Sequence, residues 1–161
     1  MGAPPALVGS TSARPCVFCA MAARGTSDAG APLLHADDKV FAFHDRSPAA
    51  MVHVLVCPRR HVEDCTSLRT SAEERELVLH MRSVGETLLS QLAPGADTVL
   101  GFHVPPFTSV PHLHLHCLAL PWAGPLGWRS VKYPADSSLL CGLRMPWFTP
   151  VDDFLLSWPH E

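Results

Sequence analysis

Residues 111–118 read Pro-His-Leu-His-Leu-His-Cys-Leu, which places three histidines at alternate positions. If this segment is a β-strand, successive side chains point to opposite faces, so His112, His114 and His116 line one face and the leucines around them are available to the core. Alternate residues lie about 7 Å apart along a strand, so the row spans roughly 13 Å between its end Cα atoms. Imidazole near neutral pH can act as a nucleophile, a proton carrier or a metal ligand, so the row predicts a functional site.

The spacing alone leaves three interpretations open. The simplest is a solvated polar face that is rich in histidine. The second is a metal hydrolase, in which two histidines at i and i+2 and a ligand from a neighbouring strand hold zinc with water in the open position. The third is covalent catalysis at phosphorus, in which one neutral imidazole attacks while its neighbours orient and protonate, without a metal.

The elements that position this row begin with a predicted hairpin. Residues 39–44 alternate in a way that fits a half-buried strand, with the phenylalanines on one face. The turn signal at 45–48 separates them from residues 52–57, which are rich in β-branched side chains and are followed by a proline. We therefore expect two antiparallel strands.

The sequence next predicts one long helix. Apolar residues recur at helical spacing up to Leu92, Ser71 and Glu74 have the spacing of a capping box, and Pro94 with Gly95 ends the helix. Two further strands are expected, at 98–104 and 112–118. Strands around one principal helix indicate an α+β domain with an antiparallel sheet. The sequence has no glycine-rich phosphate loop.

The length and charge of the chain limit the alternatives. Its 161 residues suffice for one domain, and a hydrophobic fraction of 47% provides a core without help from a metal or a disulfide. A net charge of −3 argues against a basic surface that grips nucleic acid, and we expect no sequence-specific nucleic-acid partner either. No apolar stretch approaches the roughly 20 residues of a membrane span, so we expect a soluble protein without a membrane partner.

The first fourteen residues predict a disordered tail, because Ala, Pro, Gly, Ser and Thr dominate them. They lack the basic and apolar regions of a secretory signal. We therefore expect a reducing compartment, in which the cysteines are thiols or metal ligands rather than disulfides. The six are Cys16, Cys19, Cys57, Cys65, Cys117 and Cys141.

The segment HLHLHCL at 112–118 matches the signature of the histidine triad (HIT) family, in which three histidines alternate with apolar residues. An upstream block matches as well, with FHDRSP at 43–48, HVLV at 53–56 and PRRH at 58–61. Together with CVFC at 16–19 and GFH at 101–103, the resemblance covers a HIT domain at residues 15–120. It is closest to the Hint branch, the histidine triad nucleotide-binding proteins.

The resemblance implies an enzyme that hydrolyses purine nucleoside 5′-phosphoramidates, such as adenosine 5′-monophosphoramidate, and aminoacyl-adenylates through a nucleotidylated histidine. His114 would attack the α-phosphorus, and His116 would bind a phosphate oxygen and help to move protons. His53 and His112 would support them, and Ser109 would contact the leaving group. The nucleotidyl transferases of the superfamily carry Gln in place of the third histidine, so its presence here favours hydrolysis.

The resemblance also implies a nucleoside pocket. Asp45 would accept hydrogen bonds from the ribose hydroxyls. His103 occupies the place of the Asn that begins the family's glycine-rich loop, and here the loop reads HVPPFTS at 103–109. Its two prolines remove two N–H donors, so we expect a lower rate or a changed leaving-group preference. The residues around the nucleoside would be Val17, Phe18, Phe43 and His44.

Considered without the family, several of these residues have simpler interpretations. Asp45 shortly before Pro48 is typical of a turn. His53 in an apolar strand is typical of a hydrogen-bonded core histidine, and the phenylalanines at 18, 41 and 43 are typical of the core.

Cys16 and Cys19 form a C-x-x-C pair, which supplies half of a four-ligand zinc site. Relatives with this pair commonly complete the site with the histidines that match His61 and His112, which implies a structural zinc. The alternative is a pair of buried thiols. No cofactor is expected to be required for catalysis.

Family members are homodimers whose sheets join, and they are found in the cytoplasm and the nucleus, so we expect the same here. The extension at 121–161 carries Trp122, Trp128, Trp147 and Trp158 and is expected to pack on the domain or on the dimer partner. Two other functions stay open, namely a nucleotide-binding interaction protein of low activity and a hydrolase of dinucleoside polyphosphates or cap structures.

Overall fold

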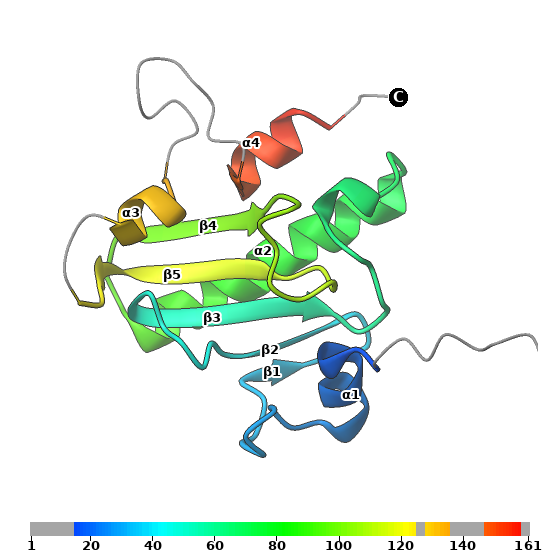
Figure 1. Cartoon of the computed structure of the whole chain (residues 1–161), viewed down its shortest axis with the longest axis horizontal. Coiled ribbons are helices and arrows are strands. Elements are labelled where there is room, and N and C mark those ends of the chain that lie inside the picture. The colour runs from blue at the N-terminus through cyan, green and yellow to red at the C-terminus, as the bar shows by residue number, and fades with distance from the viewer. Residues whose placement is uncertain (1–14, 125–127, 136–146, 159–161) are drawn as a thin grey trace, which may run out of the picture.

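The computed structural model describes residues 15–124, 128–135 and 147–158 (Figure 1). The predicted disordered tail at 1–14 and Cys141 lie outside these residues. The helices are α1 (Val17–Arg24), a 3-10 turn η1 (Cys65–Ser67), α2 (Ala72–Leu92), α3 (Trp128–Lys132) and α4 (Val151–Leu156). The strands are β1 (His35–Ala36), β2 (Val40–His44), β3 (Ala50–Pro58), β4 (Thr98–His103), β5 (Leu115–Trp122) and β6 (Phe148–Pro150).

The strands form one sheet in the order β1-β2-β3-β5-β4-β6, and all of its neighbouring strands are antiparallel. The predicted hairpin is confirmed as β2 and β3, with Ala42 opposite Val56. Figure 1 shows the long helix α2 crossing behind the sheet, while α1 lies beside β1 and β2. The predicted α+β class with an antiparallel sheet is confirmed.

β2 is buried on both faces, so the prediction of a half-buried strand is wrong. Val40 and Ala42 pack in the main core, which contains the apolar face of α2. Phe41 and Phe43 point the other way and pack with Phe18 of α1 in a second cluster. The short helix α1 covers this second face, and the alternation of residues 39–44 does not indicate that a helix packs there.

The principal helix begins as expected. The hydroxyl of Ser71 accepts the backbone N–H of Glu74 at 3.3 Å. The carboxylate of Glu74 pairs with the guanidinium of Arg60, so the hydrogen bond that Ser71 accepts is the half of the capping box that forms. Among the described residues, no helix has both the length and the apolar character needed to cross a membrane.

The described part of the C-terminal segment extends the sheet. β6 pairs with β4, with Phe102 opposite Thr149, and α4 follows directly at Val151. Gly101 permits this close approach, since a Cβ there would lie 2.5 Å from the ring of Phe148 and from a backbone oxygen. Trp158 is buried in the main core. The two ends of the sheet are therefore β1 and β6.

Candidate active site

Only the last histidine of the predicted row belongs to a strand. β5 begins at Leu115, and the backbone before it bonds elsewhere, with the N–H of Leu113 donating to the carbonyl of Val62 at 2.6 Å. The last residue pair between β4 and β5 joins Gly101 to His116, although β4 itself continues to His103 and pairs there with β6. The prediction of a strand that starts at 112 is therefore wrong.

The three imidazoles nevertheless share one side of the chain. The rings of His112 and His114 both contact Phe18, with centroids 5.6 Å and 5.5 Å from it, and the ring of His116 lies 4.9 Å from that of His114. All three are buried, which excludes a solvated polar face. On the opposite side, Cys117 rather than Leu118 continues the row of leucines, as the period of two requires.

The hydrogen bond of His114 fixes which nitrogen can react. Its Nδ1 lies 2.6 Å from the carbonyl oxygen of His112. A carbonyl oxygen only accepts, so Nδ1 carries the proton and Nε2 keeps its lone pair. Nε2 is thus set up as a nucleophile.

A second chain of hydrogen bonds determines the tautomer of His116. The backbone N–H of Ala49 donates to Nδ1 of His53 at 3.2 Å, so the proton of His53 lies on Nε2. That Nε2 lies 2.9 Å from Nδ1 of His116 and donates to it. The proton of His116 therefore lies on its own Nε2, which is buried and has no hydrogen-bond partner among the described residues. A buried N–H without a partner is suited to meet a phosphoryl oxygen or a leaving group.

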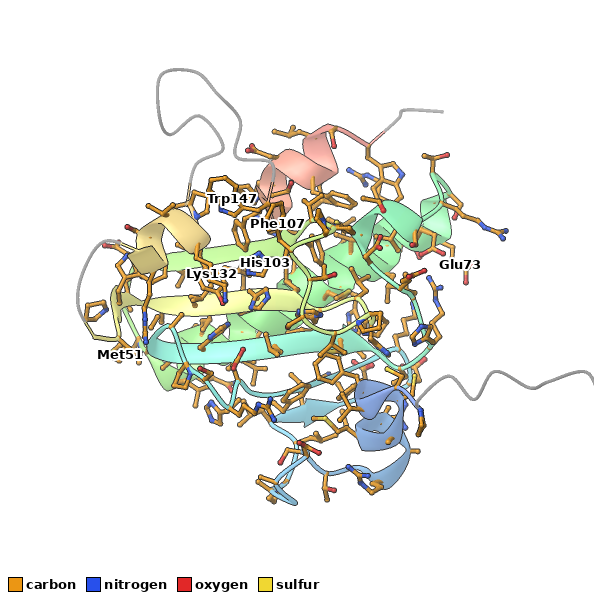
Figure 2. All side chains as sticks on the ribbon, viewed as in Figure 1. Met51, Glu73, His103, Phe107, Lys132 and Trp147 are labelled. Carbon is orange, nitrogen blue, oxygen red and sulfur yellow. The ribbon has the colours of Figure 1, made fainter. Side chains whose placement is uncertain are left out.

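His103 lies against this pair and is held from β6. Its Nδ1 donates to the carbonyl of Trp147 at 3.1 Å, and its ring lies 4.7 Å from that of His116. Figure 2 shows His103, Phe107, Trp147 and Lys132 gathered over the strands on the face that α2 does not cover. The Nε2 of His103 is also buried, has no hydrogen-bond partner in the described part of the chain, and offers a lone pair.

Burial keeps these imidazoles neutral at pH 7. It lowers the pKa of His53 to about 4, although the carboxylate of Asp45 acts in the opposite direction. It also lowers the pKa of His103 to about 4, against the hydrogen bond to Trp147. His116 is enclosed most fully, and burial together with the neighbouring histidines holds its pKa well below the ordinary value. Neutral imidazoles are what nucleophilic attack requires.

The residues predicted to contact the nucleoside lie in two places. Asp45 lies beside the catalytic histidines, and the others, Val17, Phe18, Phe43 and His44, lie on α1 and β2. The Oδ2 of Asp45 lies 3.7 Å from Nε2 of His53, and its Oδ1 also accepts the N–H of Ser47 at 2.7 Å as in a turn. Phe18 and Phe43 pack edge to face at 5.4 Å. His44 lies at the exposed end of β2, and Val17 is half-buried beside the cluster of α1.

A cavity opens beside the nucleophile, and the loop before the triad forms part of its wall. Thr108 lines this cavity, whereas the next residue, Ser109, is exposed and is not part of the lining. The lining residues are Glu63, Asp64, Cys65, His103, Thr108, His112, Leu113 and His114.

The C-x-x-C pair meets two histidines. The sulfur of Cys16 lies 3.3 Å from Nδ1 of His112, and that of Cys19 lies 3.4 Å from Nδ1 of His61. The four ligand atoms all lie within 4.8 Å of one another. Nε2 of His112 donates to the carbonyl of Pro58 at 2.9 Å, which leaves Nδ1 as the free lone pair. Two thiols and two oriented imidazoles form the donor set of a closed zinc site.

Sequence reasoning missed Tyr133, the single tyrosine of the chain. Its ring lies within 5.6 Å of those of His53, His103 and His116. It follows α3, far along the chain from every motif, so no local signal could have identified it. Thr108 lines the cavity, and no motif in the sequence singles it out.

The chain is similar to several known proteins. The family model described as scavenger mRNA decapping enzyme C-term binding matches residues 15–131. An Arabidopsis thaliana protein named bifunctional adenosine 5′-phosphosulfate phosphorylase/adenylylsulfatase HINT4 is 46% identical over 118 residues, which cover 73% of this chain and 77% of that protein. A Xenopus tropicalis protein named adenosine 5′-monophosphoramidase HINT3 is 36% identical over 142 residues, which cover 87% of this chain and 84% of that protein.

Solved structures show the same fold. A HIT family hydrolase from Clostridium thermocellum superimposes with a TM-score of 0.57 at 24% identity and covers 70% of this chain and 96% of its own. A histidine triad protein from Clostridium difficile gives a TM-score of 0.53 at 25% identity, with coverages of 71% and 98%.

Proposed function

The chain belongs to the histidine triad family, and from this premise we propose that it hydrolyses purine nucleoside 5′-phosphoramidates, such as adenosine 5′-monophosphoramidate, and aminoacyl-adenylates as well. Relatives from Xenopus tropicalis and Danio rerio, 36% and 38% identical, are named adenosine 5′-monophosphoramidases. The observation that carries the proposal is the fixed tautomer of His114, whose Nδ1–H is held by a carbonyl oxygen at 2.6 Å.

In the first step, Nε2 of His114 attacks the α-phosphorus and the P–N bond breaks, which leaves the nucleotide on the imidazole. The departing nitrogen must gain a proton to leave as an amine. The anionic phosphoryl group favours a positive charge on the pair His53–His116, and so does the carboxylate of Asp45, whose Oδ2 lies 3.7 Å from Nε2 of His53. The proton that the pair takes up with the substrate passes through Nε2 of His116 to the nitrogen.

In the second step, water attacks the phosphorus, the bond to His114 breaks, and the nucleoside monophosphate leaves. The proton of the water returns through the same pair to solvent. Each step requires charge to be stabilised on phosphoryl oxygens, and the buried N–H of His116 is oriented for this before the substrate binds.

The test incubates the protein with adenosine 5′-monophosphoramidate, follows AMP release, and searches by mass spectrometry for an adenylylated peptide that contains residues 112–116. We expect release and an adduct for the native chain and neither for His114→Gly. The control Glu76→Gln changes an exposed residue of α2 outside the cavity and should retain both. Equal, negligible release by native chain and variant with nucleotide still bound would favour a nucleotide-binding protein instead.

A second candidate is cleavage of adenosine 5′-phosphosulfate, which the name of the 46% identical plant relative supports. The attack at the α-phosphorus would be the same, but sulfate leaves as an anion and needs no proton. Rates on the phosphoramidate, on the phosphosulfate and on a dinucleoside polyphosphate, measured side by side, separate the three leaving groups.

We also propose a structural zinc ion held by Cys16, Cys19, His61 and His112. It would occupy a site with four protein ligands and supply rigidity rather than a reactive water. His112 connects this site to catalysis, because its carbonyl holds the nucleophile. Metal analysis of purified protein should find about one equivalent, and less than about a tenth of an equivalent would overturn the proposal.

The family resemblance further supports a homodimer located in the cytoplasm and the nucleus. Within one chain β6 already pairs with β4, so a sheet that continues into a partner would have to use β1 or β6. Analytical ultracentrifugation tests the dimer, and imaging of the tagged full-length protein tests the location.

A further inference from the structure

Three ligand-type side chains meet on the side of the sheet that α2 covers, apart from the residues used so far. His35 comes from the edge strand β1, Asp37 follows that strand, and His80 lies in the middle of α2. Nε2 of His35 and Nε2 of His80 each lie 2.7 Å from the same oxygen, Oδ2 of Asp37. The three ligand atoms lie within 4.8 Å of one another.

Asp37 is held so that this oxygen is available. Its other oxygen, Oδ1, accepts the backbone N–H groups of Lys39 at 2.8 Å and Val40 at 2.7 Å. Partial burial alone would raise the pKa of Asp37, but the hydrogen bonds from His35, Val40, His80 and Lys39 together hold it below the ordinary value. The carboxylate is therefore ionised and oriented, as a metal ligand must be.

The spacing of the three atoms suits a single cation. With metal–ligand distances of about 2.0–2.2 Å, two ligands on one ion lie roughly 3–3.5 Å apart, so each imidazole would have to move by about half an ångström. The side chains of His35, Asp37 and His80 are 34%, 25% and 37% exposed, which lets an ion enter and leaves room for water.

The three ligands come from elements that are held in the fold with different firmness. β1 pairs with β2 through only two residue pairs, His35 with Ala42 and Ala36 with Phe41. α2 is the longest helix among the described residues and is anchored in the core. A cation shared by these elements would tie the weakly paired edge strand to the most rigid part of the fold.

We propose that His35, Asp37 and His80 form a second metal site, which takes a divalent first-row transition metal such as zinc, nickel or copper and fastens β1 to α2. Two imidazoles and one carboxylate match the preferences of these ions, and Mg²⁺ or Ca²⁺ would require more oxygen ligands. The proposal is independent of the hydrolytic function.

Titration of metal-free protein with cobalt(II) tests it, because thiolate ligands give strong charge-transfer absorption and nitrogen and oxygen ligands do not. The native chain should bind two equivalents by calorimetry, only one of which produces the thiolate band. Asp37→Asn should lose the equivalent without the band and keep the other. The matched control Asp38→Asn removes the same charge from the exposed neighbouring residue and should bind two equivalents.

His80→Gln provides a second variant, and its retained thiolate band reports that the fold around the cysteines is intact. In protein loaded with one equivalent of zinc at the cysteine site, added nickel(II) should raise the Tm of the native chain by a few degrees and leave that of His80→Gln unchanged. If every equivalent bound by the native chain produces the thiolate band, or if Asp37→Asn still binds an equivalent without the band, the proposal is overturned and the cluster is a pair of ordinary histidine–aspartate hydrogen bonds.

Discussion

Nε2 of His53 lies 2.9 Å from Nδ1 of His116, and the backbone N–H of Ala49 on the far side of His53 gives this contact its direction. The proton on His53 is forced to Nε2, and the one on His116 is forced to its own Nε2. The backbone amide of Ala49, directly before β3, thus determines which atom of a catalytic imidazole faces the substrate.

The first prediction follows from this arrangement. His116→Ala removes the N–H through which the leaving nitrogen gains its proton, so hydrolysis of adenosine 5′-monophosphoramidate should slow by about 10²–10⁴-fold in kcat. Cleavage of adenosine 5′-phosphosulfate, whose leaving group needs no proton, should slow by a smaller factor, because it loses only the contact of this N–H with the phosphoryl oxygen. Steady-state kinetics on both substrates measure the difference, and equal losses would exclude proton delivery by His116.

The second prediction concerns the proposed zinc ion. Cys19→Ser should lower bound zinc to near zero, reduce the free energy of unfolding by on the order of 2–5 kcal/mol, and reduce kcat by roughly 10-fold, because His112 then holds His114 less firmly. Metal analysis, urea denaturation and kinetics check the three parts. Arg24→Ala on the exposed end of the same helix is the control. Full activity in a zinc-free Cys19→Ser protein would contradict the link to catalysis.

The third prediction is a loss of stability in mild acid. The pKa of His53 and that of His103 fall from 6.5 to about 4 on folding, first because both are buried. Lys132 and His114 lower both further, while Asp45 raises that of His53. The unfolded chain thus binds more protons between these values, so stability is complete above about pH 6.5 and declines as the pH falls toward 4. Each imidazole accounts for on the order of 1–3 kcal/mol.

Urea denaturation at pH 7.0 and pH 4.5 measures this loss, before the carboxylates with lowered pKa values contribute at still lower pH. His103→Leu removes one of the two groups and should reduce the pH dependence, whereas His44→Gln changes an exposed histidine and should not. A native chain that is equally stable at both pH values would contradict the prediction.

The sequence sufficed to predict the hairpin, the long helix and the identity of the triad, because each has a strong local period or motif. The start of β5 and the burial of β2 were not predictable in this way. Leu113 bonds to Val62 across a loop, and α1 covers Phe41 from a distant part of the chain. Both depend on tertiary contacts that periodicity does not encode.

The same distinction between local motifs and tertiary contacts applies to the candidate site. The C-x-x-C pair and the histidines at 61 and 112 could be assembled only through the family resemblance, since 42 residues separate Cys19 from His61. Tyr133 and the carbonyl of Trp147 come from the C-terminal segment and match no motif. Thr108, rather than Ser109, lines the cavity because of the course of the loop, which its sequence does not specify.

The fourth prediction concerns this loop. Pro105 and Pro106 cannot donate backbone hydrogen bonds to a phosphoryl group. Replacing both with glycine restores two N–H groups near the cavity and should raise kcat for the phosphoramidate by up to about 10-fold, with KM changed less. Pro94→Gly changes an exposed proline in the turn after α2 and serves as the control. Unchanged kinetics in a folded double variant would show that the prolines do not limit the rate.

The fifth prediction tests how β6 supports the site. A Cβ on Gly101 would lie 2.5 Å from the ring of Phe148 and from the backbone oxygen of Thr149, so Gly101→Ala must push β6 away from β4. The free energy of unfolding should fall by about 1–3 kcal/mol. Because the carbonyl of Trp147 next to β6 holds Nδ1 of His103 at 3.1 Å, kcat should fall too.

Hydrogen exchange should show faster exchange at Val104, whose N–H also bonds to Trp147. Gly95→Ala, in the turn after α2, should be destabilising without this local exchange or the loss of kcat, and identical exchange at Val104 in both variants would mean that β6 does not anchor His103.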